Sequence, residues 1–113
     1  MKELGDIDRI GHMVERIRRI QASLQGVSDE QFYQSSLLID GVTYNFAIIG
    51  EAANNVSIAM RNKYLDIPWR TIVAMRNFLI HEYIKIEPRL LWETAQNDLP
   101  PLLRQLENII GES

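Results

Sequence analysis

Apolar residues recur at three- and four-residue steps along most of this chain, and this period is what most constrains its fold. The first long segment, residues 6–25, has apolar positions at Ile10, Met13, Val14, Ile17, Ile20 and Leu24. On an α-helix these positions form one stripe, which predicts an amphipathic helix that ends at Gly26. No segment shows the alternation of apolar and polar residues that is typical of a strand. The period therefore predicts an all-α fold.

A second helical region follows that glycine. Ser28 and Gln31 have the spacing of a capping box, in which each side chain bonds to the backbone of the other residue, so a helix should begin there. After a possible break near Asp40–Gly41, an apolar stripe continues almost to Tyr64: Val42, Phe46, Ile49, Ala53, Val56 and Met60. Four further residues widen this apolar surface: Tyr44, Ile48, Ala52 and Ala59. Such a helix could pack in its own bundle and also against a second subunit.

Proline residues mark the remaining helices. Pro68 suits the first turn of a third helix, because its missing N–H costs nothing there, and this helix should run to about His81 or Tyr83. Pro88 should begin a fourth helix. Pro100–Pro101 must kink or interrupt that last helix, because proline lacks a donor and clashes with the preceding turn.

Length and composition narrow the class of protein. The 113 residues are enough for one core and too few for two, so we expect one domain, residues 1–113, folded as a four-helix up-and-down bundle with a kinked last helix. There is no cysteine, which excludes disulfides, thiolate metal sites and cysteine nucleophiles. The stretch Met1–Asp6 lacks the apolar core of a signal peptide, and no apolar run approaches membrane-spanning length. We therefore expect a cytoplasmic protein with no membrane partner.

Net charge limits the kind of nucleic-acid contact. The formal net charge is -3 and the sequence pI is about 5.3, so the protein as a whole lacks the excess of positive charge that is typical of nucleic-acid-binding proteins. Any RNA contact must depend on a local basic patch. The densest basic cluster lies on the outer face of the first helix and consists of Arg9, Arg16, Arg18 and Arg19. Charge runs on helices are most often solvated faces, and we favour that interpretation over a nucleic-acid surface.

The segment Arg76–Tyr83 concentrates polar side chains inside an otherwise apolar helix. Buried polar groups need partners, so this segment is either a site or a polar seam between helices. On a helix Arg76 and Tyr83 share a face, and Asn77 and His81 share the adjacent one. Arg76 and His81 are separated by about 140° at roughly 100° per residue. They can meet if the arginine bends, if the helix unwinds near its end, or if a two-fold axis brings in the copies from a second subunit.

These residue types could cleave a phosphodiester without a metal ion. His81 is the side chain here that can exchange a proton near neutral pH, and Arg76 stays charged and binds phosphate in a bidentate way. In RNA the 2′-hydroxyl is already the nucleophile, so the histidine would move protons and the arginine would stabilise charge developing on phosphorus. A metal site has little support, since His12 is far away in the sequence and Glu82 alone is not a ligand set.

Structural roles account for the same residues. Taken alone, one arginine and one histidine at this spacing are common, and a buried structural pair of Arg76 and His81 is then favoured over catalysis. Glu51 lies inside the apolar zone of the second helix. We favour an ion pair between Glu51 and an arginine across the bundle over a role as a catalytic carboxylate.

The wider pattern resembles a known family. An arginine and a histidine separated by four residues, with asparagine after the arginine and a tyrosine two residues after the histidine, resemble the HEPN domain and, more narrowly, the HepT-like toxin group. Other matching features are Ile49-Gly50-Glu51-Ala52, Ile67-Pro68-Trp69 and Asn97-Asp98-Leu99-Pro100, so the resemblance runs from about residue 28 to 110. The combination of the arginine–histidine element with Pro-Trp and the tyrosine makes the resemblance specific.

The resemblance implies an all-helical homodimer with a composite, metal-independent ribonuclease site in which Arg76 and His81 are catalytic and Asn77 assists. It implies a toxin that acts on RNA and not DNA, with no cofactor. It also implies a cognate antitoxin with a minimal nucleotidyltransferase fold, which in this group transfers AMP to the motif tyrosine, here Tyr83. A negative charge placed beside Arg76 would pair with the guanidinium that is expected to bind an RNA phosphate.

Two further interpretations concern the transferase. This chain is not the transferase itself, because Asp6-Ile7-Asp8 has an Asp-x-Asp form but no Gly-Ser turn after a strand precedes it. The alternative to a toxin is a non-catalytic subunit that binds a nucleotide or docks a nucleotidyltransferase partner. The acidic net charge keeps this alternative open, because attraction of RNA is mainly electrostatic.

Overall fold

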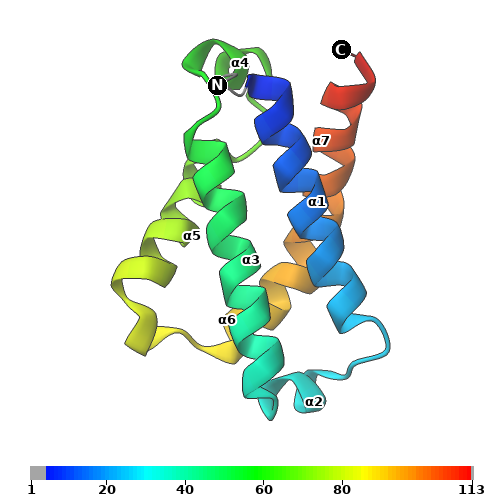
Figure 1. The fold of residues 1–113 in the computed structure, drawn as a ribbon, viewed down its shortest axis with the longest axis vertical. Helices are drawn as coiled ribbons and strands as arrows, with labels where there is room; N and C mark the ends of the chain where they lie inside the picture. Colours follow the sequence, from blue (N-terminus) through cyan, green and yellow to red (C-terminus); the bar gives the residue numbers. More distant parts are fainter. Residues whose placement is uncertain (1–4, 113) are drawn as a thin grey trace, which may run out of the picture.

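The computed structural model describes residues 5–112, and every regular element in this part of the chain is helical (Figure 1). The longer helices are α1 (Asp6–Leu24), α3 (Ser36–Asn54), α5 (Trp69–His81) and α7 (Leu99–Glu112), and the short ones are α2 (Asp29–Tyr33), α4 (Ile58–Lys63) and α6 (Pro88–Glu93). The 3-10 turn η1 (Tyr83–Lys85) follows α5, and the π-helical turn η2 (Thr94–Asp98) joins α6 to α7. The predicted all-α fold is confirmed. Residues 1–4 of the predicted N-terminal stretch, and residue 113, lie outside the described residues.

Helix α3 lies between α1 and α5, and α7 runs along α1 (Figure 1). Because α6, η2 and α7 follow one another without a loop, four long segments make up the bundle. The stripe predicted on α1 is buried throughout, at Ile10, Met13, Val14, Ile17, Ile20 and Leu24. Burial of each such side chain contributes about 1.5–3 kcal/mol, which fixes α1 against its neighbours. The apolar residues form stripes rather than continuous runs, and no helix between residues 5 and 112 is long and apolar enough to cross a membrane.

The predicted capping box at the start of α2 is confirmed. Ser28 Oγ accepts from the backbone N–H of Gln31 at 3.1 Å, and Gln31 Oε1 accepts from the N–H of Ser28 at 2.9 Å. The break predicted near Asp40–Gly41 is wrong, because α3 runs straight through both residues. The chain breaks earlier, at Ser35, whose Oγ caps α3 by accepting from the N–H of Leu38 at 3.2 Å. A glycine inside a helix costs only about 0.5–1 kcal/mol, which packing on both sides of α3 can offset.

Helix α3 also ends at Asn54, not near Tyr64 as predicted. Ser57 starts a separate helix, α4, by accepting from the N–H of Met60 at 3.1 Å. Arg61 then folds back and donates to three backbone carbonyls at the end of α3, those of Ala53 (2.9 Å), Asn54 (2.8 Å) and Val56 (3.1 Å). The last carbonyls of a helix need partners from outside it. Arg61 therefore stabilises a break that the continuous apolar period concealed.

The interruption predicted at Pro100–Pro101 takes the form of the π-helical turn η2. A proline has no N–H to donate to the carbonyl of Gln96 one turn earlier. The backbone widens just before the prolines, where the N–H of Leu99 donates to the carbonyl of Thr94, five residues back rather than four. The helix continues after this turn as α7, with a change of direction that is visible in the orange part of the ribbon (Figure 1).

One side of α3 faces solvent along its whole length, and we call it the open face of α3. Its residues recur at three- and four-residue steps: Leu37, Gly41, Tyr44, Ile48, Glu51 and Asn55. Leu37 is 83% exposed and Tyr44 is 58% exposed, while Ile48 is half-buried. The wide apolar surface predicted for this helix therefore reaches solvent at Tyr44 and Ile48, whereas Ala52 is buried in the chain's own core. Its coverage by a second subunit stays a prediction.

Candidate active site

Helices α3 and α5 approach each other closely at Gly50. A Cβ atom built on Gly50 would overlap the Cβ of Arg76, and it would lie 3.0 Å from Arg76 Cγ and 3.1 Å from the carbonyl oxygen of Ile72. The absence of a side chain at Gly50 is what allows this approach. The base of the Arg76 side chain consequently lies against the backbone of α3, which places its guanidinium beside the next residue, Glu51.

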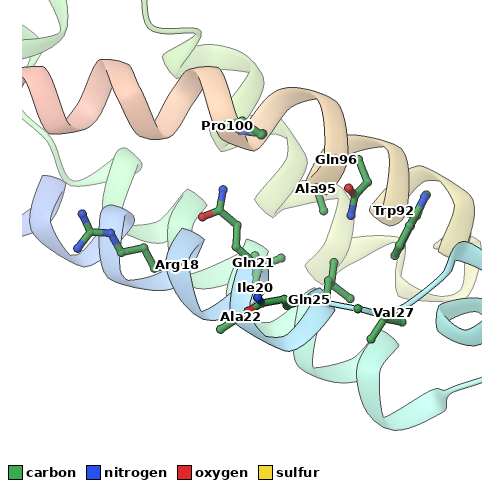
Figure 2. Close-up of a pocket in the computed structure, with 12 residues that line it drawn as sticks. Arg18, Ile20, Gln21, Ala22, Gln25, Val27, Trp92, Ala95, Gln96 and Pro100 are labelled. Atoms are coloured by element: carbon green, nitrogen blue, oxygen red, sulfur yellow. The ribbon is translucent and has the colours of Figure 1, made fainter.

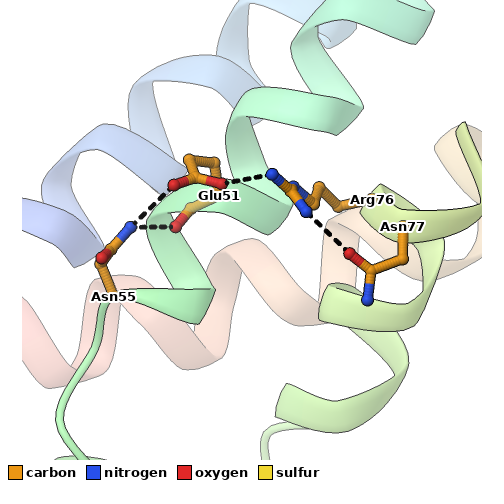
Figure 3. A network of polar contacts seen from close by, with 4 residues as sticks. All are labelled: Glu51, Asn55, Arg76 and Asn77. Atoms are coloured by element: carbon orange, nitrogen blue, oxygen red, sulfur yellow. Dashed lines mark hydrogen bonds and ion pairs between the residues drawn. The ribbon is translucent and has the colours of Figure 1, made fainter. Parts of the chain in front are cut away.

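The Arg76 guanidinium joins the two helices (Figure 3). Its Nη2 lies 3.0 Å from Oε2 of Glu51, and its Nη1 donates to Oδ1 of Asn77 at 2.8 Å. The other carboxylate oxygen of Glu51 accepts from Nδ2 of Asn55 at 3.1 Å, and the same amide donates to the Glu51 carbonyl at 2.9 Å. The interpretation that Glu51 pairs with an arginine across the bundle is confirmed, and that arginine is Arg76.

One buried nitrogen of Arg76 is left without an acceptor within residues 5–112. Its Nε is buried and makes no hydrogen bond within residues 5–112. A buried donor without a partner costs about 1–3 kcal/mol. The Arg76 side chain is 27% exposed and that of Glu51 is 49% exposed, so solvent screens their ion pair, which contributes at most about 1 kcal/mol. The observed position of the guanidinium is therefore held only weakly.

His81 is the last residue of α5 and is exposed. The helix ends because Glu82 leaves the helical conformation (φ -123°, ψ 35°) while its N–H still donates to the carbonyl of Phe78 at 2.9 Å. Tyr83, which is 68% exposed, therefore lies in η1 and not on a continuous helical face with Arg76 as predicted. Residues 81–85 line a hollow of about 190 Å³ at this end of the helix.

Arg76 and His81 lie on different sides of α5, as their spacing predicts. Arg76 faces α3, whereas the outer side of α5 carries exposed residues at three- and four-residue steps: Arg70, Ala74, Asn77 and His81. The arginine bends toward Glu51 instead of toward the histidine, and the helix unwinds only after His81. A single chain therefore brings Arg76 and Asn77 together and leaves His81 apart from the guanidinium.

Three of the four arginines in the basic cluster on α1 contact neighbouring side chains. Arg18 pairs with Glu107 at 2.8 Å, Arg19 pairs with Glu15 at 2.9 Å, and Arg16 donates to Asn45 Oδ1 at 3.2 Å. The guanidinium of Arg16 also lies over the ring of Tyr44, 5.7 Å from its centroid. Acidic partners reduce the positive potential that these arginines offer to a phosphate. The contacts agree with the solvated face favoured for this cluster.

Figure 2 shows a separate hollow. It is a groove of about 660 Å³ between the end of α1 and the segment from Trp92 to Pro100, and none of its lining residues belongs to α3 or α5. Three amide side chains and an indole give it a mixed polar and apolar lining: Gln21, Gln25, Gln96 and Trp92.

Among the described residues, no three His, Cys, Asp or Glu side chains are grouped so that they could hold a metal ion.

A comparison with known families matches most of this chain. The family described as Ribonuclease HepT-like matches residues 13–109, a range that includes α3, α5 and η1. The chain belongs to this family. The resemblance seen in the motif around Arg76 and His81 is thereby confirmed.

Relatives of this HepT-like protein match along nearly its whole length. It is 30% identical over 102 residues to a probable ribonuclease HepT of Thermococcus cleftensis, covering 90% of this chain and 93% of the relative. It is 32% identical over 99 residues to a protein of Caldanaerobacter subterraneus subsp. tengcongensis named as a putative RNase, covering 88% of each. A Methanocaldococcus jannaschii protein named as a gamma-glutamylcyclotransferase and putative RNase is 33% identical over 103 residues, which are 91% of this chain but 46% of that relative. No solved structure matches the chain.

Two residues beside Arg76 have no role that the sequence alone predicts. Gly50 lies in the segment Ile49-Gly50-Glu51-Ala52 that resembles the family, but no local pattern indicates that another helix lies against it. Asn55 follows Glu51 by four residues, so on a helix the two side chains are neighbours. That spacing was the signal that could have identified Asn55.

Proposed function

We propose that this HepT-like protein is a metal-independent endoribonuclease and the toxin of a toxin–antitoxin pair, acting in the cytoplasm. The observation that carries the proposal is the placement of Arg76 at the α3–α5 contact, with Asn77 bonded to it and His81 exposed at the end of the same helix. Arg76 supplies a fixed charge with planar donors for a phosphate, and His81 supplies a group that exchanges protons near neutral pH. These are the two functions that RNA cleavage through the 2′-hydroxyl requires.

The proposed reaction is an internal transfer at phosphorus. The 2′-hydroxyl gives its proton to a His81 imidazole and attacks phosphorus, while the bond to the 5′ oxygen breaks and that oxygen takes a proton from a second acid. The products are a 2′,3′-cyclic phosphate and a 5′-hydroxyl. Arg76 stabilises the charge that develops on the non-bridging oxygens, and Asn77 orients Arg76 by accepting from its Nη1.

A homodimer would supply the second acid. Within one chain Arg76 and His81 lie on different sides of α5, so a second copy related by a two-fold axis is the way to place two arginines and two histidines around one phosphate. The surface near them is apolar and uncovered: Leu37 and Tyr44 on the open face of α3, Ile80 (44% exposed), and Ile84 (85% exposed). Exposed apolar surface that is rimmed by polar residues is typical of an interface between chains.

The exposed Tyr83 would serve as the regulatory position. A minimal nucleotidyltransferase antitoxin would transfer AMP from ATP to the Tyr83 hydroxyl, which loses its proton as pyrophosphate leaves. Tyr83 is 68% exposed and lines the hollow next to His81, so a partner can reach it without unfolding α5. The added phosphate would place a negative charge and a bulky nucleoside where RNA must enter.

The test uses purified protein and a labelled RNA in the presence of EDTA. We expect cleavage by the wild type and a loss of about 100-fold or more in both Arg76→Ala and His81→Ala, as is typical when a charge stabiliser or a general acid–base group is removed. His12→Ala is the matched control, because His12 is the other histidine, exposed on α1. Cleavage that requires an added divalent metal, or that persists in both variants, would contradict the proposal.

A non-catalytic role is the second candidate. It is favoured by the net charge of -3 and by Glu51, whose carboxylate offsets the charge of Arg76 at the site. In that case the same residues would bind a nucleotide or dock a nucleotidyltransferase partner. His81→Ala would then weaken binding of the nucleotide or partner, while the wild type would show no RNA cleavage above background.

A further inference from the structure

We propose that Glu51 holds Arg76 in a resting position, and that an RNA phosphate must displace the Glu51 carboxylate before Arg76 can bind it. This inference rests on the proposed ribonuclease function of the same site. Two observations carry it. Glu51 Oε2 lies 3.0 Å from Arg76 Nη2 and pairs with it. With the guanidinium in this position, Arg76 Nε is buried without an acceptor.

Glu51 is the fixed partner of the pair. Asn55 donates both to a carboxylate oxygen and to the backbone carbonyl of Glu51, so the carboxylate stays in place when the guanidinium leaves (Figure 3). Apart from its hydrogen bond to Asn77, Arg76 is fixed at its base, where its Cβ lies against Gly50. The outer part of the Arg76 side chain can therefore rotate while its inner part remains between the helices.

The exchange of a carboxylate for a phosphate improves the bonding of Arg76. In the resting position, Glu51 and Asn77 use one nitrogen each and Nε has no acceptor. A phosphate can accept two parallel hydrogen bonds from Nε and one Nη nitrogen, and such charge-assisted pairs are stronger than neutral hydrogen bonds. The ion pair that must be broken is partly exposed and screened by solvent. Glu51 therefore competes with RNA for Arg76 without preventing binding.

The test measures binding of an RNA oligonucleotide with 2′-O-methyl groups, which lacks the nucleophile and cannot be cleaved. Fluorescence anisotropy would compare the wild type, Glu51→Gln, Arg76→Ala and the double variant at several salt concentrations. Glutamine keeps an oxygen that can accept from Asn55 but removes the charge. We expect Glu51→Gln to bind the oligonucleotide roughly threefold to fivefold more tightly, the limit set by an ion pair of about 1 kcal/mol. We also expect its plot of log K against log salt to be steeper by about 0.7, because no carboxylate is released to recruit a cation.

The double variant separates competition for Arg76 from general repulsion. In the Arg76→Ala background, the gain from Glu51→Gln should fall below about twofold, because the two residues interact directly. Glu30→Gln is the matched control: it removes one charge from an exposed position on α2, away from Glu51 and Arg76, and should leave affinity unchanged. Glu51→Ala should also raise affinity, which provides a second variant if glutamine perturbs the fold.

Any other result of these binding measurements would refute the competition between Glu51 and RNA, the ribonuclease proposal, or both. An equal gain with and without Arg76 would show simple repulsion and would overturn the competition between Glu51 and RNA. Weaker binding by both Glu51 variants would show that the carboxylate is needed to position Arg76, and would overturn it as well. RNA cleavage by the wild type with unchanged affinity of Glu51→Gln would refute this inference alone. A wild type that neither binds the oligonucleotide nor cleaves RNA in EDTA would refute the ribonuclease proposal and this inference together.

Discussion

Replacing Gly50 by alanine should disturb the candidate active site, because it would force α3 and α5 apart where Gly50 contacts Arg76. The added Cβ would overlap the Cβ of Arg76 and lie 3.1 Å from the Ile72 carbonyl oxygen. Neither neighbour is the end of a flexible side chain, since one is the first atom of a side chain and the other is backbone. Carbon atoms in contact are about 3.5–4.0 Å apart, so α5 must move away from α3 by on the order of 1 Å.

The size of the effect follows from two opposing terms. Overpacking a close contact typically costs about 1–3 kcal/mol. Alanine in place of glycine within a helix returns about 0.5–1 kcal/mol, because the unfolded chain has less freedom to lose. We therefore expect Gly50→Ala to lower the free energy of unfolding by about 1–2 kcal/mol. A displacement of about 1 Å at the base of Arg76 would also reduce RNA cleavage by roughly 100-fold, if Arg76 binds the reacting phosphate.

Gly41→Ala is the matched control in the same helix. Gly41 lies on the open face of α3, and a Cβ there would meet no atom within 4 Å. This variant should be more stable than the wild type by about 0.5–1 kcal/mol. The measurements are urea denaturation and the rate of RNA cleavage in EDTA. If Gly50→Ala is stabilised as much as Gly41→Ala, the close approach of α5 at Gly50 is refuted.

Three further predictions test the surrounding structure. Arg61→Ala should lower the free energy of unfolding by about 2 kcal/mol, because three carbonyls lose a charged donor, and a loss below about 0.5 kcal/mol in urea denaturation would contradict that role. The Ser57 hydroxyl (2.6 Å) and backbone N–H (2.8 Å) hold the pKa of Asp6 below its ordinary value of 3.8. The stabilisation by Asp6 should be complete above that ordinary value and lost as the pH falls through the lowered pKa; Asp6→Asn should remove this pH dependence from denaturation curves. Coexpression with a minimal nucleotidyltransferase should add the mass of AMP to the wild type and not to Tyr83→Phe, and an unchanged adduct in the variant would exclude Tyr83 as the acceptor.

Local sequence signals predicted α1 and the start of α2, but they missed where α3 begins and ends. The stripe on α1 and the capping box at Ser28 depend on residues within one or two turns, and both are observed. The end of α3 was not predicted, because Val56 and Met60 continue the apolar period across the break at Ser57. A period reports which residues face the core, and it does not report whether the backbone between them is continuous. Arg61 stabilises this break through contacts that form only when its side chain folds back to the carbonyls at the end of α3.

In the candidate site, too, the sequence predicts what depends on local geometry and misses contacts between residues distant in the sequence. Helix geometry alone separates Arg76 from His81 by about 140°, and the structure keeps them on different sides of α5. No such rule could show that Arg76 lies against Gly50 and Glu51, because these residues belong to another helix. In a sequence, an arginine that joins two helices looks the same as one that binds a phosphate. The buried Nε, which has no acceptor within residues 5–112, supports our proposal that Arg76 binds a phosphate, because buried donors are usually paired. That unused donor is the physical reason to expect that Arg76 binds something other than Glu51 when the site is at work.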